Sequence, residues 1–305
     1  LARSPGFANI AGKTPVFGEA ARLQARLHPR QNFNQFWSQL SLDPLPEKTT
    51  LFRHSADLAY GHLSALTKPL DFANGAVIAA PSNYTRNQLA VLLGVVKQCT
   101  FDTVGLVDLA LLHAAGSQAD ECIIIDLQLH QTVLSSFRKV DGYLHKERMV
   151  QVPFSGLLAL QDAWTSMIAD EFIRQSRFDP LRNAETEQYL HNQLEQWLQA
   201  SLVNAEVPIE INHKGSVHQA RLTLAHFEQR AQSIFNRINK EIGELRNPET
   251  ALHVKASLMN LPGLTRFIPG LIALDDDVVM QACVQHLEHI QRAPGNLQFV
   301  TRLPL

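Results

Sequence analysis

Two aspartates stand at the ends of apolar runs, where carboxylates can do chemistry. Asp126 follows the run from Cys122 to Ile125, and Asp108 follows the run from Thr103 to Val107. A run without a polar face is typical of a buried inner strand, and the end of such a strand delivers side chains to a cleft. A carboxylate there can transfer a proton or order a metal-bound water. A structural role is the favoured interpretation for both residues, because a carboxylate can also cap a helix or hydrogen-bond a strand end.

Histidine and aspartate clusters elsewhere indicate no further chemistry. His286 and His289 are three residues apart and could present two imidazoles to a metal. No third ligand is identifiable, so we expect a solvated helix face and no metal. The acids at 275–277 precede an apolar helix and favour N-terminal capping over a calcium loop, because no periodic oxygen ligands follow. The sequence has no Walker loop, Gly-x-Ser-x-Gly elbow or Cys-His pair.

Length and composition predict a soluble globular protein with two domains or lobes. The chain has 305 residues, of which 45% are hydrophobic and 18% charged. Its formal net charge of −2 gives no general field for nucleic acid or an anionic membrane. No apolar run is long enough to span a membrane. Cys99, Cys122 and Cys283 are widely spaced in apolar surroundings, which indicates buried, reduced thiols in a cytoplasmic protein.

An alternation of apolar strands and amphipathic helices sets the fold class. We expect strands at Gly75–Pro81 and Thr103–Val107 and a further strand from Glu121, with helices at Thr85–Gln98 and Asp108–Ala115 between them. Strands that alternate with helices predict parallel neighbours joined by right-handed crossovers. The chain is therefore predicted to be an α/β protein.

The stretch from Glu121 to Val150 predicts a strand meander. Asp141-Gly142 separates two strand-like runs, and both residues tolerate the positive φ of a two-residue hairpin turn. A second strand pair is expected from Val207 to Leu222, with its turn at Lys214-Gly215. The other elements expected after the meander are helices at 156–175, 184–202, 224–245 and 276–291, and strands at 251–258 and 297–303.

The first seventy residues are rich in turns and carry shorter helical patterns. Helices are expected at Glu19–Leu27 and Arg53–Leu66. Between them, Phe33, Phe36 and Trp37 recur at helical spacing from Gln31 to Leu45. A helix face packed into a small subdomain is the favoured interpretation, and a ligand-stacking platform is the alternative.

The order of elements resembles that of the nucleotide-binding domain of seventy-kilodalton heat-shock chaperones. The segment from Val77 to Ala115 is similar to their strand-helix-strand-helix passage, and Phe17 to Ala21 resembles their Gly-Glu-x-Ala motif. Glu121 to Phe137 falls where these proteins have a second phosphate loop. Leu222 to Glu228 resembles a helix start of the family, and Leu261 to Pro269 falls at its adenosine loop. The similarity covers nearly the whole chain.

This resemblance implies a two-lobed actin-like ATPase (ribonuclease-H-like) fold, with central mixed sheets flanked by helices around a nucleotide cleft. Lobe I would comprise residues 1–117 and 277–305, with a small subdomain at about 11–70. Lobe II would comprise residues 118–276, with a subdomain at about 180–245. The family also has a first phosphate hairpin with an Asp-x-Gly-Thr pattern, which would precede Leu1.

The second phosphate loop departs from the family pattern. Glycines there let backbone N–H groups approach phosphate oxygens and adopt positive φ. This chain has Gln128, Leu129, His130 and Gln131 instead of a glycine triplet and a hydroxyl residue. A non-glycine residue forced to positive φ costs about 1–2 kcal/mol. We expect the side chains of Gln128, Leu129 and His130 to occupy part of the phosphate position.

The other cleft-lining positions implied by the resemblance are also altered. Ser155-Gly156 keeps one glycine of a family Gly-Gly step, although helix capping explains the pair equally well. Asn260 and Gly263 mark the adenosine loop, where one glycine remains beyond a proline. The helix that would clamp adenine offers Asn192 and Glu195 in place of a Glu and a Lys.

Asp108 stands where the resemblance places a catalytic glutamate, and Asp126 could reach a metal-bound water. Because the glycine loops are missing, we interpret the two acids as the remnant of an ATPase site. The sequence thus predicts a pseudo-ATPase that serves as a scaffold or binds a protein partner not identified by the sequence, with no cofactor, nucleic acid or membrane. The alternative is a working ATPase that binds ATP or ADP with Mg²⁺, with its first phosphate loop upstream of Leu1. A sugar kinase on the same fold lacks any recognisable sugar-site pattern.

Overall fold

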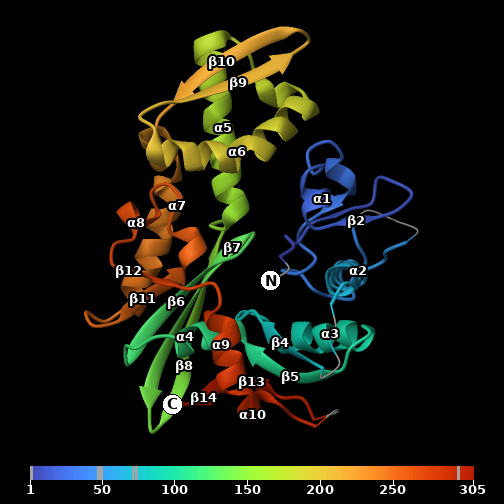
Figure 1. The fold of residues 1–305 in the computed structure, drawn as a ribbon, viewed down its shortest axis with the longest axis vertical. Coiled ribbons are helices and arrows are strands. Elements are labelled where there is room, and N and C mark those ends of the chain that lie inside the picture. Colours follow the sequence, from blue (N-terminus) through green and yellow to red (C-terminus); the bar gives the residue numbers. More distant parts are fainter. Residues whose placement is uncertain (1–2, 47–50, 71, 73–74, 294–295) are drawn as a thin grey trace. The chain divides into compact units, whose positions relative to one another are not determined.

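A computed structural model describes residues 3–46, 51–70, 72, 75–293 and 296–305. The chain forms two compact units (Figure 1). Unit 1 comprises Leu1–Gly116, Lys139–Lys146 and Val278–Leu305, and unit 2 comprises Ser117–Arg138 and Glu147–Asp277. Both contain sheets flanked by helices, and the largest sheet has both parallel and antiparallel pairs. The predicted α/β class is confirmed at this level.

Unit 1 is built around a parallel sheet in the order β13-β5-β4. The strands are β4 (Ala76–Ala80), β5 (Thr103–Asp108) and β13 (Phe299–Val300). Helix α3 (Arg86–Lys97) connects β4 to β5 and begins at a reciprocal capping box, in which Thr85 Oγ1 accepts from the Gln88 N–H at 3.2 Å. Because β5 pairs with both β4 and β13, the sheet joins the first half of the chain to a segment near its C-terminus.

The remaining elements of unit 1 are short, except helix α2. A three-stranded antiparallel sheet has the order β2-β1-β3, and β14 pairs antiparallel with residues 143–145. The bounds are β1 Ala8–Asn9, β2 Val16–Phe17, α1 Glu19–Arg22, β3 Asn32–Phe33, α2 Ser55–Thr67, α4 Leu109–Ala115, α9 Val278–Gln285, α10 Leu287–Ile290 and β14 Arg302–Pro304, with a 3₁₀ helix at Pro29–Gln31.

Unit 2 contains a mixed sheet in the order β12-β11-β6-β7-β8. Strand β6 pairs antiparallel with β7 and parallel with β11, and β11 pairs parallel with β12. The bounds are β6 Glu121–Leu127, β7 Gln131–Val140, β8 Tyr143–Pro153, β11 Ala251–Lys255 and β12 Leu271–Leu274. The tip of the β7–β8 hairpin, residues 139–146, belongs to unit 1.

The helices of unit 2 enclose a large aromatic core. Trp164, Phe172, Phe227 and Phe235 are almost fully buried, and Trp164 Nε1 donates to the Phe227 carbonyl oxygen at 2.9 Å. Figure 1 shows the β9–β10 hairpin over α5 and α6, which it contacts. The bounds are α5 Leu157–Ser176, α6 Ala184–Val203, β9 Val207–His213, β10 Ser216–Leu222, α7 Leu224–Leu245 and α8 Leu264–Phe267, with 3₁₀ helices at Pro180–Arg182 and Ala256–Leu258.

The strongest local signals of the sequence are confirmed. Helix α7 has the predicted bounds, and α2, α3, α4, α5 and α6 lie within two residues of theirs. Both predicted hairpin turns form. Asp141 and Gly142 have φ of 50° and 78°, and Lys214 and Gly215 have φ of 50° and 80°.

The prediction that β4, β5 and β6 would be parallel neighbours is wrong for β6. Strand β5 pairs with β4 and β13, whereas β6 pairs with β7 and β11 in the other unit. Alternation along the chain predicts parallel strands, but it does not say that each successive strand joins the same sheet. The partner β11 comes from more than a hundred residues further along the chain.

Five other predicted elements differ from the structure, one of them the strand expected at 251–258, which ends at Lys255 and is followed by a 3₁₀ helix. Residues 31–45 form β3 and turns instead of a helix, and the first helix ends at Arg22. The expected helix at 276–291 is divided into α9 and α10, and the final strand is divided into β13 and β14 because its halves pair with different strands. Strand β12 was not predicted. Cys122 is buried, but Cys99 and Cys283 are only half-buried, and none of these three described cysteines forms a disulfide.

His62 of α2 explains why the aromatic segment of unit 1 folds without a helix. Its Nδ1 accepts a hydrogen bond from Trp37 Nε1 at 2.8 Å, and its Nε2 lies 2.7 Å from Ser4 Oγ. An indole N–H can only donate, so the proton of the neutral imidazole is on Nε2 and is donated to Ser4. The ring also contacts Phe17 and Phe36. His62 therefore holds three segments together and has no free lone pair with which to deprotonate Ser4.

Burial lowers the pKa of His62 to about 4, from an ordinary value of 6.5. The His62 imidazole takes up its second proton near pH 6.5 in the unfolded chain, but only near pH 4 in the folded chain. We therefore expect the free energy of unfolding to fall by about 3 kcal/mol as the pH decreases from 6.5 to 4. Urea titrations across this range would measure the slope. His62→Gln keeps an acceptor for Trp37 and should have a shallower slope; equal slopes in both proteins would contradict the assignment.

Candidate functional site

Residues 128–131 form a tight turn between β6 and β7. The Gln128 N–H donates to the Gln131 carbonyl oxygen at 2.9 Å, and all four residues are half-buried. Gln128, Leu129, His130 and Gln131 all have negative φ, since the described non-glycine residues with positive φ lie elsewhere. The expected strain is therefore absent. The chain adopts a turn that ordinary residues accept, instead of a glycine loop whose N–H groups surround an anion.

The carbonyl groups of this turn cover the N-terminus of α5. The Leu157 N–H donates to the Gln128 oxygen at 2.9 Å, and the Leu158 N–H donates to the Leu129 oxygen at 2.9 Å. The first N–H groups of a helix have no partner within the helix and commonly bind anions. Here the protein itself supplies the acceptors.

Gly156, immediately before α5, lies directly against the same turn. A Cβ at this position would be 2.4 Å from the Gln131 nitrogen, 2.5 Å from the His130 carbonyl carbon and 2.6 Å from the Gln128 oxygen. Its φ of −83° is one that any residue can adopt. The glycine is therefore required for close approach of two backbone segments, not for an unusual conformation.

Ser155 is fully buried and joins the ends of two strands. Its Oγ donates to the Val152 carbonyl oxygen at 2.7 Å and accepts from the Thr132 N–H at 3.1 Å. Thr132 Oγ1 in turn donates to the Ser155 carbonyl oxygen at 2.9 Å. The hydroxyl group is engaged on both sides within the protein.

Asp126 is oriented toward the turn that follows it. Its Oδ2 accepts from Gln128 Nε2 at 2.8 Å, and Gln131 Nε2 lies 3.5 Å from Gln128 Oε1. These residues form a short polar chain along the turn. The structure thus brings together Asp126, the turn at 128–131, Ser155 and Gly156 in unit 2.

Asp108 belongs to unit 1 and is completely buried. Its Oδ1 accepts from the Ala110 N–H at 2.9 Å, which caps α4, and from the Ser82 hydroxyl. Its Oδ2 is 2.5 Å from Lys146 Nζ. These are the contacts of a helix cap and a buried ion pair, and they use both carboxylate oxygens.

The adenosine-loop positions lie elsewhere in unit 2. Asn260 is exposed in a turn, and Gly263 begins α8 with φ 87°. A Cβ on Gly263 would be 2.9 Å from the Phe267 ring, so this position needs glycine for both its φ and its packing. On α6, Asn192 accepts from Gln188 Nε2 at 2.8 Å, and Glu195 is exposed. These residues have roles in turns and helix surfaces.

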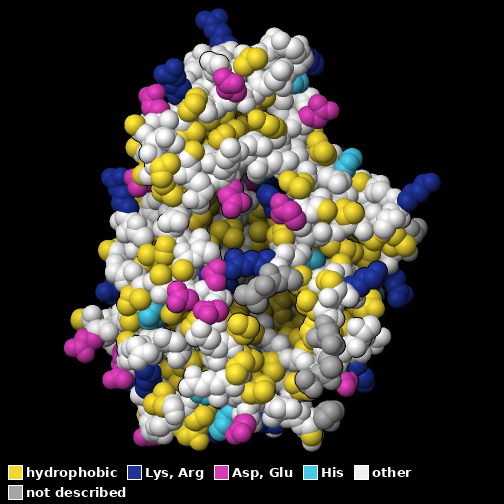
Figure 2. Space-filling view, viewed as in Figure 1, with side chains coloured by type: hydrophobic (Ala, Val, Ile, Leu, Met, Phe, Trp, Pro, Cys, Tyr) yellow, Lys and Arg dark blue, Asp and Glu magenta, His cyan; other side chains and the backbone are white. Residues whose placement is uncertain are grey.

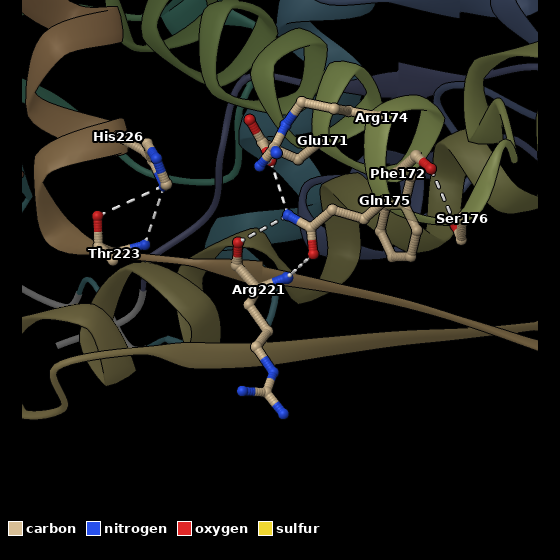
Figure 3. Close-up of polar contacts among 8 residues, drawn as sticks. All are labelled: Glu171, Phe172, Arg174, Gln175, Ser176, Arg221, Thr223 and His226. Atoms are coloured by element: carbon tan, nitrogen blue, oxygen red, sulfur yellow. Dashed lines mark hydrogen bonds and ion pairs between the residues drawn. The ribbon is translucent and has the colours of Figure 1, made fainter.

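Gln175 is a structural residue that the sequence analysis missed. Its Oε1 accepts from the Arg221 N–H at 2.9 Å, and its Nε2 donates to the Arg221 oxygen at 3.2 Å and to Glu171 Oε2 at 2.7 Å (Figure 3). The amide of α5 thus pairs with the outer edge of β10 as a neighbouring strand would. Glu171 also forms an ion pair with Arg174, which lowers the pKa of its carboxyl group. No periodic pattern reveals a glutamine with this role.

The neighbouring polar contacts in Figure 3 stabilise helices. The Thr223 N–H donates to His226 Nδ1 at 3.2 Å in a capping box of α7. Ser176 Oγ donates to the Phe172 carbonyl oxygen at 2.9 Å near the end of α5. This polar group therefore positions elements and is not arranged as a catalytic cluster.

Across the part of the chain that the structure describes, no group of three or more His, Cys, Asp or Glu side chains could hold a metal ion. His286 precedes α10, and burial, with a smaller effect from His289, lowers its pKa. No helix within the described ranges is long and apolar enough to cross a membrane. On the face drawn in Figure 2, acidic and basic side chains are interspersed.

Comparison with known proteins adds no family to these observations. Neither a scan against protein-family models nor a search of curated proteins gives a significant match for this chain.

Proposed function

We propose that this chain is a divergent actin-like domain, related to heat-shock chaperones, in which ATP hydrolysis is weak or lost and which acts as a scaffold or partner-binding protein. The sheet of unit 2 supports the fold. Its antiparallel strands β6 and β7 continue into the β7–β8 hairpin, and β11 and β12 follow parallel to β6. This is the strand arrangement expected of a ribonuclease-H-like lobe.

The N-terminus of α5 is the observation that carries the functional proposal. In a phosphate-binding arrangement its N–H groups would be free for oxyanions. In this protein the N–H groups of Leu157 and Leu158 are bonded to the Gln128 and Leu129 carbonyl oxygens. A phosphate group placed there would face two carbonyl dipoles of the wrong sign and would have to displace the whole turn.

The carboxylates support the same proposal. Asp108 is neutralised by Lys146 and used as a helix cap, so it is not available to order a metal-bound water. Asp126 is bonded to the turn beside it. A domain that does not cycle a nucleotide would act through binding alone, and its partner would recognise a fixed surface.

We expect no saturable binding of MgATP or MgADP at the α5 N-terminus in calorimetric titrations of the full-length protein, with affinity weaker than about 1 mM, or about 4 kcal/mol. Thermal unfolding with and without nucleotide gives a second readout, because a ligand at a hundred times its Kd stabilises by about 2.7 kcal/mol.

Asp126→Asn is the matched variant for this test, since Asn keeps an oxygen to accept from Gln128. Micromolar binding in the natural protein that Asp126→Asn weakens at least tenfold would overturn the proposal in favour of a working ATPase. Equal and negligible binding by both proteins would support it.

A further inference from the structure

A separate cavity of about 460 Å³ lies in unit 2, where α5 ends and the β9–β10 turn comes close to it. Its volume is in the range of small-molecule sites. Basic side chains line it from three segments of the chain: Arg177 after α5, Arg182 in the 3₁₀ helix, and His213 with Lys214 at the hairpin turn. Such convergence of cations produces a local positive potential in a protein whose net charge is slightly negative.

The charges in this cavity do not balance. Asp179 is the acid in the lining, and its oxygens are engaged by the Leu181 N–H at 3.1 Å and by Arg182 Nε at 3.2 Å. The structure gives the side chains of Arg177 and Lys214 no ion pair or hydrogen bond within unit 2, all of which is described. The cavity therefore presents an excess of two cations.

The backbone at these two cations is unusual. Arg177 and Lys214 have φ of 53° and 50°, in the left-handed region that favours glycine or asparagine. The C-terminal cap of a helix and the first position of a two-residue hairpin turn are both sites where those residues are preferred. Each time, the chain has a long cation instead. Two residues that line one cavity thus depart from the residue types preferred at their backbone positions. Such departures indicate that their side chains have a function.

An aromatic wall completes the cavity. The Phe178 ring stacks on His218 with centroids 3.9 Å apart and planes inclined by 9°, and it lies 5.5 Å from the His213 ring. An apolar wall reduces the screening of nearby charges by water. The cavity thus combines an excess of positive charge with an aromatic surface beside it.

We propose that this cavity binds a small ligand with two adjacent oxyanion groups, of the kind found in diphosphates. Arg177 and Lys214 are the principal anchors. Arginine suits such a ligand because its planar guanidinium donates to two oxygens at once, and lysine adds a mobile point charge.

Inorganic pyrophosphate is the probe that tests this inference. Calorimetric titration of the full-length protein at low salt should give saturable binding in the micromolar to low millimolar range, weakened by added salt. Arg177→Gly and Lys214→Gly should each weaken binding at least about tenfold. Because glycine accepts the left-handed backbone at both positions, these variants should fold as well as the natural protein or better.

Lys240→Gln is the control with the same change in net charge. Lys240 is exposed on α7 and paired with Glu244, outside the cavity lining. Its variant should bind pyrophosphate like the natural protein. Absence of saturable pyrophosphate binding, or equal weakening by all three variants, would overturn the inference.

Citrate is the second probe, because it carries adjacent carboxylates instead of phosphoryl groups. Pyrophosphate binding stronger than citrate binding assigns the site to phosphorylated ligands, and the reverse overturns that assignment.

The Arg177→Gly, Lys214→Gly double variant also separates this site from the α5 N-terminus. Nucleotide binding that persists in the double variant would count against the proposed loss of ATP binding, and nucleotide binding that disappears would belong to this cavity.

Discussion

Replacing Asp108 with alanine is expected to lower the free energy of unfolding by about 3 kcal/mol, because half-buried Lys146 loses its ion-pair partner and α4 loses its cap. Lys146, the Ser82 hydroxyl and the Ala110 N–H would all lose their acceptor. Asp108→Asn should be milder, since an amide oxygen can still cap α4. Urea denaturation followed by circular dichroism would measure both changes.

The Asp108→Asn, Lys146→Met double variant is the informative control. It removes both charges and should recover part of the stability lost by Asp108→Asn alone, as expected for a pair whose separate members are costly to bury. If the Asp108 variants were as stable as the natural protein, the carboxylate would not be a structural cap, and a catalytic role would regain support.

Gly156→Ala is expected to destabilise the protein by about 3 kcal/mol, at the upper end for overpacking, because the three atoms nearest to the new methyl group all belong to the backbone. The Cβ would lie within 2.6 Å of three backbone atoms of the turn at 128–131. Alanine can adopt the backbone conformation of Gly156. The loss of stability would therefore result from the steric contact with the turn and not from an unfavourable φ. Thermal and urea denaturation would both detect it.

Gly243→Ala is the matched control for this substitution. Gly243 lies within α7, and nothing is within 4 Å of the position that its Cβ would take. Alanine there should stabilise by about 0.5–1 kcal/mol through helix propensity. If Gly156→Ala were tolerated like Gly243→Ala, the turn could move away from α5, and the helix N-terminus would be open to an anion.

The sequence was most informative where one local signal decides the structure. Helix α7 combines a regular apolar face with a capping threonine, and both two-residue turns are set by the residues that accept positive φ. The helix predicted around Phe36 and Trp37 was wrong, although the aromatic spacing matches a helix. Trp37 instead bonds to His62, a residue distant in sequence. The pairing of β6 with β11 was hidden for the same reason.

The candidate site was predictable in its residue types and not in its hydrogen bonds. The absence of glycines at 128–131 is visible in the sequence. The direction of the Gln128 and Leu129 carbonyl groups depends on the path of the turn and on how closely Gly156 approaches it. Lys146 could not be paired with Asp108, since it reaches unit 1 only through the tip of the β7–β8 hairpin.

The discontinuity of unit 1 has a consequence for synthesis on the ribosome. Strand β13 completes the sheet beside β5, yet residues 299–300 emerge only after all of unit 2 has been made. At about 5–20 residues per second, β5 would wait for roughly ten seconds or more with one edge uncovered. Unpaired edges promote association between chains. We therefore expect nascent chains that stop before β13 to depend on chaperones, and released chains to complete unit 1 last.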